Sequence, residues 1–250
     1  NYSEGRRKNM RYPNIVEFSV VGDYALFSDP VTRVGGEKCT YQIPTYEALK
    51  GILSSVYWKP TIIWYIDKVR VMNPIRMETK GIRTMMYNGG NDLSYYTYLK
   101  DCRYQVSAHF EWNENRPELI GDRNENKHHE IAKRMIVKGG RRDIFLGTRE
   151  CQGYVEPCVF GEGNGAYDET PMISFGHMYH GITYPDESFS GETKCRMTLN
   201  FWYPKMENGV IVFPKPQDCS NHKYLHEMKM KAFGADNANF TGLKEFGEVH

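Results

Sequence analysis

The order of strand-like and helix-like segments between Asn14 and Phe160 constrains the fold most. β-branched and aromatic residues predict strands at 14–22, 61–72 and 95–112, and shorter strand pieces at 143–147 and 153–160. Helical spacing of apolar residues predicts one helix before residue 60 and another before residue 139. The order strand, helix, strand, strand, helix, strand is that of an α+β, ferredoxin-like βαββαβ domain, in which two helices cover one face of the sheet.

The ends of both predicted helices can be read from single residues. Thr45 has the side chain of an N-cap for the first helix, and Pro60 ends that helix because proline disfavours helical backbone in the residue before it. The second helix keeps its apolar residues on one face and ends at the Gly139-Gly140 pair, a typical C-terminal cap. Residues 14–160 are therefore expected to form the first domain.

The remainder of the chain has a different character. Strand-like segments and the Asn208-Gly209 turn, a strong hairpin signal, predict a small antiparallel β-sheet extension over residues 161–214. Residues 215–250 are polar, contain one weakly helical stretch, and are expected to form a loosely packed tail. Residues 1–13, which include Met10, are interpreted as a leader or an expression remnant ahead of the natural start.

Composition limits the class of protein. The 250 residues carry 32 basic and 31 acidic side chains, so any nucleic-acid binding requires a local basic face rather than a high net charge. The six cysteines are scattered and form no C-x-x-C pair, which favours free thiols in a reducing cytoplasm. The longest apolar run is too short to cross a bilayer, and no signal-peptide pattern is present. A cytoplasmic protein without a membrane partner is expected.

Two common kinds of site are disfavoured. His128 and His129 are adjacent, so on a helix they diverge by about 100° and could not both bind one metal ion. No H-x-x-x-H or H-x-x-E-H pattern occurs, and we predict neither a metal nor another cofactor. The glycine-rich segment 161–169 lacks the lysine and hydroxyl of a P-loop and is interpreted as a plain loop.

Positive charge is concentrated between Gly121 and Arg149. This stretch has eight basic residues (Arg123, Lys127, Lys133, Arg134, Lys138, Arg141, Arg142, Arg149) against four acidic ones (Asp122, Glu125, Glu130, Asp143). A solvated helix face is the ordinary explanation for such a run. Its arrangement favours anion binding, because Lys127 and His128 fall at a helix start and Arg141 and Arg142 follow a glycine pair.

A histidine beside a lysine at such a helix start suits RNA cleavage without a metal. In that reaction a ribose 2′-hydroxyl attacks the adjacent phosphorus, and protons move to and from the reacting oxygens. Histidine can serve either proton role, and lysine supplies positive charge. Tyr57 is a candidate third group. It would need cationic neighbours to act as a base, and a packed aromatic ring at a helix end is the alternative interpretation.

Four blocks of the sequence carry a family resemblance. They are "FSVVGDYALFSDP", "GGEKCTYQIPTYEALKGILSSVYWKPT", "DRNENKHHEI" and "KGGRRDIFLGTRECQGYVEP". From about Met10 to Phe213 the chain resembles the CRISPR-associated RAMP proteins of type I-C systems, the Cas-five subtype d (Dvulg) group. The resemblance implies a ferredoxin-like (RRM-like, RAMP) domain with an added antiparallel sheet.

The resemblance also implies an activity and partners. It implies an endoribonuclease that cuts the repeat hairpin of precursor CRISPR RNA without a metal, leaving a 2′,3′-cyclic phosphate and a 5′-hydroxyl. It further implies that the protein stays on the 5′ handle of the mature crRNA, together with the other subunits of the type I-C interference complex.

Carried over residue by residue, the resemblance makes Tyr57, Lys127 and His128 the catalytic residues. Four basic residues are assigned to RNA-backbone contact: Arg123, Lys138, Arg141 and Arg142. The second histidine, His129, departs from the family pattern and should point elsewhere. Which of Tyr57 and His128 is the base stays open.

A different class of function remains as the alternative. Some relatives in other CRISPR subtypes clamp the RNA handle without cutting it, and this chain could be such a structural subunit. Nonspecific binding of duplex DNA could accompany either activity, because phosphate contacts carry no sequence information.

Overall fold

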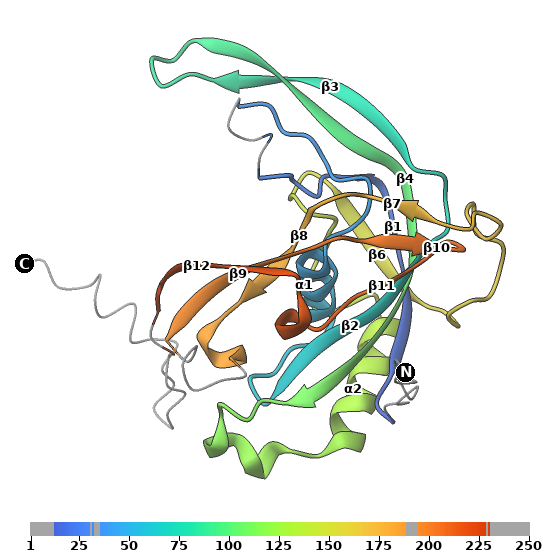
Figure 1. The fold of residues 1–250 in the computed structure, drawn as a ribbon, viewed down its shortest axis with the longest axis vertical. Coiled ribbons are helices and arrows are strands. Elements are labelled where there is room, and N and C mark those ends of the chain that lie inside the picture. Colours follow the sequence, from blue (N-terminus) through green and yellow to red (C-terminus); the bar gives the residue numbers. More distant parts are fainter. Residues whose placement is uncertain (1–12, 31, 33–35, 189–194, 229, 231–250) are drawn as a thin grey trace, which may run out of the picture.

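The computed structural model describes residues 13–30, 32, 36–188, 195–228 and 230 of the chain (Figure 1). Within them the strands form a nine-stranded sheet of order β5-β6-β1-β4-β2-β11-β10-β7, with β3 paired to β4, and a three-stranded sheet of order β12-β9-β8. The strands of the larger sheet are β1 (Val16–Ala25), β2 (Ile62–Val71), β3 (Arg76–Met85), β4 (Asn91–Trp112), β5 (Ile144–Phe145), β6 (Gln152–Pro157), β7 (Ile173–Ser174), β10 (Lys205–Glu207) and β11 (Val210–Val212). Those of the smaller sheet are β8 (Met178–Thr183), β9 (Arg196–Trp202) and β12 (Asn221–Glu227).

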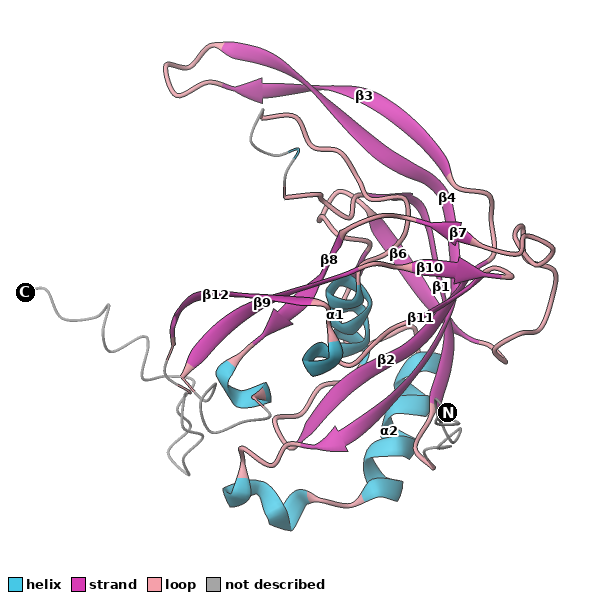
Figure 2. Ribbon diagram, in the orientation of Figure 1, coloured by secondary structure: helices cyan, strands magenta, loops and turns pink. Residues whose placement is uncertain are grey.

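The centre of the larger sheet has the ferredoxin-like order. Strands β6, β1, β4 and β2 are neighbours, and each pair is antiparallel. Helix α1 (Tyr46–Val56) connects β1 to β2 and packs on β2, while α2 (Glu125–Val137) follows β4 and packs on β1 and β6 (Figures 1 and 2). The two helices also contact each other. The predicted α+β fold class is confirmed.

Local chemistry explains where the helices begin and end. The Thr45 hydroxyl accepts a hydrogen bond from the Ala48 amide at 3.1 Å, and α1 ends at Val56, before Pro60. At the end of α2, the amides of Gly139 and Gly140 donate to the carbonyls of Ile136 and Met135 at 3.0 and 2.8 Å. Both glycines have positive φ (85° and 104°), which is the Schellman cap that glycine adopts without strain. The predicted caps are confirmed.

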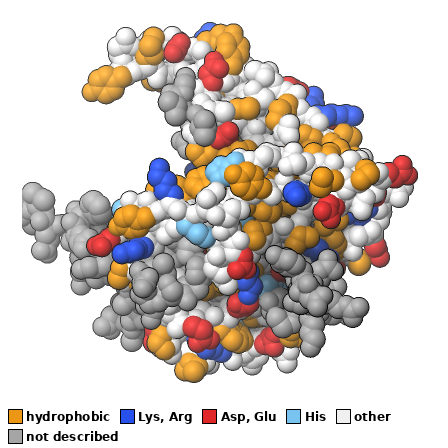
Figure 3. Space-filling view, in the orientation of Figure 1, with side chains coloured by type: hydrophobic (Ala, Val, Ile, Leu, Met, Phe, Trp, Pro, Cys, Tyr) orange, Lys and Arg blue, Asp and Glu red, His pale blue; other side chains and the backbone are white. Residues whose placement is uncertain are grey.

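A long hairpin was missed by the sequence interpretation. We expected only a glycine-rich connection before a strand starting at residue 95, whereas β3 pairs along its whole length with the first part of β4. The residues of β3 are largely charged or polar, so no apolar alternation marks them as a strand. The hairpin projects from the body, and Figure 3 shows apolar side chains at its tip, where Met85 and Tyr87 are exposed.

The expected extension over residues 161–214 is divided between the two sheets. Strands β7, β10 and β11 lengthen the larger sheet through the pairing of β11 with β2, and only β8 and β9 lie in the smaller sheet. The Asn208-Gly209 turn joins β10 to β11, and both residues have positive φ, as this hairpin turn requires.

The polar tail predicted over residues 215–250 differs from the structure in one respect. It contains β12, which pairs with β9, where we expected only a weakly helical stretch. Residues 229 and 231–250, and residues 1–12 of the predicted leader, lie outside the described residues. In the described part of the chain, no helix combines the length and apolar character that crossing a membrane requires.

The glycine-rich loop at 161–169 is held by a buried arginine. Arg70 on β2 contacts both carboxylate oxygens of Asp168, at 3.0 and 2.6 Å, and also donates to the carbonyls of Glu162 and Gly163. Gly165 donates its amide to the same carboxylate at 2.7 Å. The loop is therefore anchored to the sheet face opposite the helices by its own ion pair.

His180 on β8 makes the fold sensitive to acid. It is fully buried, stacks on Tyr46 with ring centroids 4.2 Å apart, and donates through Nε2 to the Pro214 carbonyl. Burial lowers the pKa of His180 to about 3. Because this pKa is depressed, the stabilisation is fully present above the ordinary histidine pKa of about 6.5 and is lost as pH falls towards the folded value.

We expect the free energy of unfolding to fall by about 3 kcal/mol through this histidine between about pH 6.5 and about pH 4. His180→Phe keeps a ring against Tyr46 and should flatten that loss in denaturant titrations at the two pH values. His177→Phe, at an exposed histidine stacked on Phe201, is the control and should retain the acid slope of the unaltered protein. Equal slopes for His180→Phe and the unaltered protein would contradict the assignment.

Candidate active site

Tyr57 and His128, which are 71 residues apart in the sequence, are in direct contact. The Tyr57 hydroxyl lies 2.7 Å from Nδ1 of His128. Tyr57 is the C-cap residue of α1, and His128 lies in the first turn of α2, after the Asn124 side chain has capped that helix by accepting from the Lys127 amide at 3.0 Å. The packing of α1 against α2 on one sheet face therefore creates the contact.

An aromatic shell encloses this pair. His128 has no exposed surface and Tyr57 is 4% exposed, so Tyr57 is the more accessible of the two side chains. The indole of Trp64 donates to the Tyr57 carbonyl at 2.7 Å, and the rings of Phe110 and Trp112 meet His128 edge-on. The rings fix the imidazole in a site of low polarity, where its remaining polar contacts gain strength.

The contact at the second ring nitrogen fixes the direction of the hydrogen bond to Tyr57. Nε2 of His128 lies 2.8 Å from the backbone carbonyl oxygen of Asp122, and a carbonyl can only accept, so Nε2 carries a proton. In the neutral imidazole, Nδ1 is then the unprotonated nitrogen. The Tyr57 hydroxyl therefore donates to Nδ1, and Nδ1 is placed to take the phenolic proton.

The Asp122 carboxylate organises the opposite side of the imidazole. One oxygen accepts from Lys127 Nζ at 2.5 Å, and the other accepts from the Thr61 hydroxyl at 2.8 Å and lies 3.5 Å from His128 Nε2. The hydrogen bond from Lys127, assisted by Thr61 and by the charges of both basic neighbours, lowers the pKa of Asp122. An ionised carboxylate thus stands beside the imidazole and stabilises it when it takes up a proton.

Burial is the main influence on the pKa of Tyr57. It raises the pKa of the phenol, the negative charge of Asp122 raises it further, and the positive charge of Arg141 opposes both. The hydroxyl is therefore protonated at neutral pH. A chain of contacts runs from Tyr57 through His128 to Asp122, with the proton-accepting nitrogen behind the hydroxyl.

The predicted site residues do not all take part in this series of contacts. Lys127 reaches the pair through Asp122, while His129 points away and contacts the Ile15 carbonyl at 2.9 Å. Asp122 and Thr61 were missed by the sequence interpretation. Asp122 belongs to one of the four family blocks, but nothing in its spacing from His128 indicates that its backbone and side chain serve the same ring.

The basic residues assigned to RNA contact differ in their exposure and in their partners. Arg123 is mostly buried, and its guanidinium contacts Glu114 at 2.9 Å and the Asn113 carbonyl at 3.1 Å. Lys138 is exposed at the end of α2. Arg141 and Arg142 line a cavity of about 330 Å³ together with Ser54, Ser55 and Trp58, at the end of α1 that also carries Tyr57.

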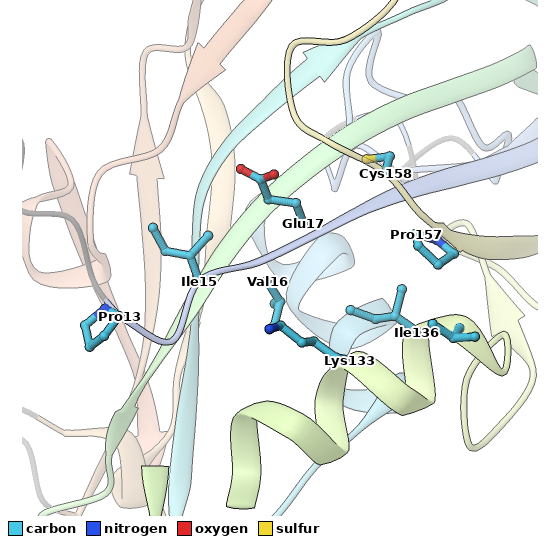
Figure 4. A pocket seen from close by; sticks show the side chains of 9 residues that line it. Pro13, Ile15, Val16, Glu17, Lys133, Ile136, Pro157 and Cys158 are labelled. Atoms are coloured by element: carbon cyan, nitrogen blue, oxygen red, sulfur yellow. The ribbon is translucent and has the colours of Figure 1, made fainter. Parts of the chain in front are cut away.

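A second cavity, of about 750 Å³, lies between β1, α2 and the end of β6 (Figure 4). Its wall is largely apolar and contains one acid and one base, Glu17 and Lys133, and none of the predicted catalytic residues lines it. Among the residues that the structure describes, no group of three histidine, cysteine, aspartate or glutamate side chains is placed to hold a metal ion.

Comparison with known proteins identifies the family. The Cas5d model, described as "CRISPR-associated protein (Cas_Cas5)", matches residues 15–214. A CRISPR pre-crRNA endoribonuclease Cas5d of Mannheimia succiniciproducens is 33% identical over 231 residues, covering 80% of this chain and 95% of the relative. A protein of the same name from Thermus thermophilus is 26% identical over 152 residues, covering 57% of this chain and 63% of the relative.

A solved structure agrees with these relatives. The crystal structure of a CRISPR-associated protein is 35% identical, with a TM-score of 0.70, and the similarity covers 84% of this chain and 96% of that one. The family resemblance read from the four sequence blocks is thereby confirmed. The chain, with its ferredoxin-like core and its Tyr57–His128 contact, belongs to the Cas5d family of CRISPR-associated proteins.

Proposed function

We propose that this protein is a metal-independent endoribonuclease that cuts the repeat hairpin of precursor CRISPR RNA. Two relatives carry the name pre-crRNA endoribonuclease, which supports the substrate. The observation that carries the chemistry is the 2.7 Å contact between the Tyr57 hydroxyl and an imidazole nitrogen free to accept its proton. Afterwards the protein stays on the 5′ handle as a subunit of the type I-C interference complex.

The contact suggests a proton relay. The attacking 2′-hydroxyl gives its proton to the Tyr57 oxygen while Tyr57 passes its own proton to Nδ1 of His128. The 2′-oxygen bonds to phosphorus, the bond to the 5′-oxygen breaks, and the leaving oxygen takes a proton from water. His128 then returns its proton through the Tyr57 hydroxyl to solvent, where it neutralises the hydroxide left when water protonated the 5′-oxygen. In this scheme Tyr57 touches the RNA, and His128 is the base behind it.

The charged neighbours have separate tasks in this scheme. Asp122 is a positioning residue that orients His128 and stabilises the imidazolium. Lys127 and Arg141 supply positive charge to the phosphorane, whose extra negative charge develops only in the transition state. Lys127 approaches the phosphate when it exchanges its partner Asp122 for RNA. This exchange suits its half-exposed side chain, which is 48% accessible.

The alternative function is a subunit that binds the handle without cutting it. Two observations favour it: His128 is fully buried, and Lys127 is already paired with Asp122, as in a purely structural arrangement. The alternative predicts normal binding of the hairpin and no cleavage by the purified protein.

Cleavage of a labelled precursor repeat by the purified protein tests the proposal. We expect cutting in the presence of EDTA, with 2′,3′-cyclic phosphate and 5′-hydroxyl ends, because no step requires a metal ion. A single 2′-deoxy substitution at the attacking nucleotide should abolish cutting because the nucleophile is gone. Cleavage of the deoxy RNA, or loss of activity in EDTA alone, would contradict the mechanism.

We also propose that the protein works in the cytoplasm. The cysteines are free thiols, as expected for a reducing compartment.

A further inference from the structure

Trp58 is an exposed ring, and no described residue pairs with it. It is 46% exposed, whereas Trp64 and Trp202 are buried and Trp112 packs against His128. In the described part of the chain, the Trp58 indole makes no ring stacking, cation–π contact or hydrogen bond. Tyr57 is the preceding residue, and the positive charge of Arg141, which lines the same cavity as Trp58, acts on the Tyr57 phenol, so the cavity lies near the reactive hydroxyl.

The two arginines that line the cavity likewise have no partner of opposite charge among the described residues. Among the described residues, neither Arg141 nor Arg142 forms an ion pair, whereas Arg123 and Lys127 are both neutralised by carboxylates. The Arg142 amide donates to the Ser55 carbonyl at 3.1 Å, and this hydrogen bond holds the loop that carries Arg141 and Arg142 against α1. The backbone that carries the two guanidinium groups is thus held in place, and their charge is available to an anion.

The cavity between these groups has the dimensions of a ligand site. Its volume of about 330 Å³ falls at the lower end of the roughly 300–1,000 Å³ typical of small-molecule pockets. The small hydroxyl side chains of Ser54 and Ser55 line it together with the indole and the two arginines. An aromatic plane for a base, two cations for phosphates and hydroxyls for polar edges are the features by which proteins bind unpaired nucleotides.

We infer that this cavity binds one unstacked nucleotide of the RNA next to the scissile phosphate, with its base on Trp58 and its phosphates on Arg141 and Arg142. The inference rests on the proposed function, because Tyr57 is what places the cavity at the reaction. Taking a nucleotide out of the helical stack frees its backbone to bring the 2′-oxygen into line with the leaving 5′-oxygen. Trp58 is then a positioning residue that selects the backbone geometry.

Trp58→Ala tests this site through binding as well as cleavage. A stacked base contributes about 1–3 kcal/mol, so Trp58→Ala should weaken RNA binding and raise KM by about 5- to 140-fold. Trp58→Phe keeps a stacking ring and should restore most of the affinity. Tyr154→Ala, at an exposed tyrosine of β6 on the opposite sheet face, is the matched control and should bind and cut normally.

Tryptophan fluorescence supplies a readout that a structural role would not change. With the uncleavable 2′-deoxy hairpin, binding should quench the emission of the unaltered protein, because Trp58 is its exposed indole. Trp58→Phe should bind the hairpin without this quenching. Hairpins with an abasic nucleotide on either side of the scissile phosphate identify the stacked base. One of them should lose the quenching and become insensitive to Trp58→Ala.

The outcomes separate this inference from the proposed function. Cleavage with unchanged KM in Trp58→Ala, or quenching unaffected by either abasic RNA, overturns the nucleotide site and leaves the ribonuclease standing. Quenching that depends on Trp58 in a protein that cuts no RNA supports the nucleotide site and overturns the ribonuclease.

Discussion

Tyr57→Phe is expected to slow cleavage of the precursor RNA by about 10²- to 10⁴-fold, the usual contribution of a positioned proton-transfer group. The substitution removes only the hydroxyl that joins His128 Nδ1 to the substrate, and the ring still fills its place against the aromatic shell. Stability should fall by about 1–3 kcal/mol, because the buried Nδ1 of His128 loses its hydrogen-bond partner. Single-turnover cleavage at saturating RNA, together with a thermal melt, measures both effects.

Tyr46→Phe is the matched control for this experiment. Tyr46 lies on the same helix, is buried, and donates its hydroxyl to the Trp64 carbonyl at 3.5 Å. Tyr46→Phe therefore removes the same hydroxyl group as Tyr57→Phe, but at a position on α1 away from His128. Cleavage should proceed at the rate of the unaltered protein. If Tyr57→Phe also cuts at that rate, the relay is wrong and the base must be sought elsewhere.

His128→Ala should have two separable effects. Loss of the proton acceptor should slow cleavage by about 10³-fold or more. Removal of a fully buried side chain should also lower the free energy of unfolding by about 2–5 kcal/mol, because it leaves a cavity and two polar partners without a contact. Cleavage is therefore measured well below the melting temperature of the variant.

Two further measurements keep this prediction decisive. Added imidazole should restore part of the cleavage by His128→Ala, which a purely structural defect would not permit, and His128→Gln offers a better-packed variant. His129→Ala is the neighbouring control: it loses only the contact with the Ile15 carbonyl and should cut normally. A folded His128→Ala protein that cuts at full rate would overturn the proton-acceptor role of His128.

The fold was predictable where residue patterns are local. The apolar spacing of α1, the cap at Thr45 and the glycine pair after α2 each carry their own signal, and the structure has all three. Strand β3 lacks such a signal because charged side chains suit a hairpin exposed on both faces. The addition of β11 to β2 joins segments about 140 residues apart and depends on a sheet edge that no local pattern describes.

In the candidate site, too, the residues with a local sequence signal were predicted and the others were not. Tyr57 and His128 were predicted because they lie in the family blocks and at recognisable helix ends. The role of Asp122 depends on the backbone of the turn Pro117–Asp122, which directs a carbonyl and a carboxylate to the same ring. The pairing of Arg123 with Glu114 likewise depends on that turn, so charge counting could not separate Arg123 from Arg141.

The Tyr57–His128 contact joins two segments that are distant in the sequence, so the proposed site forms only when folding is complete. A nascent chain that has emerged only as far as α1 carries the phenol without its acceptor, and a proteolytic fragment containing α2 carries the imidazole alone. Under the proposed mechanism, neither piece would cut RNA, and separation of the two helices would end the activity. Under the proposed mechanism, premature cutting by an unfinished polypeptide would thereby be avoided.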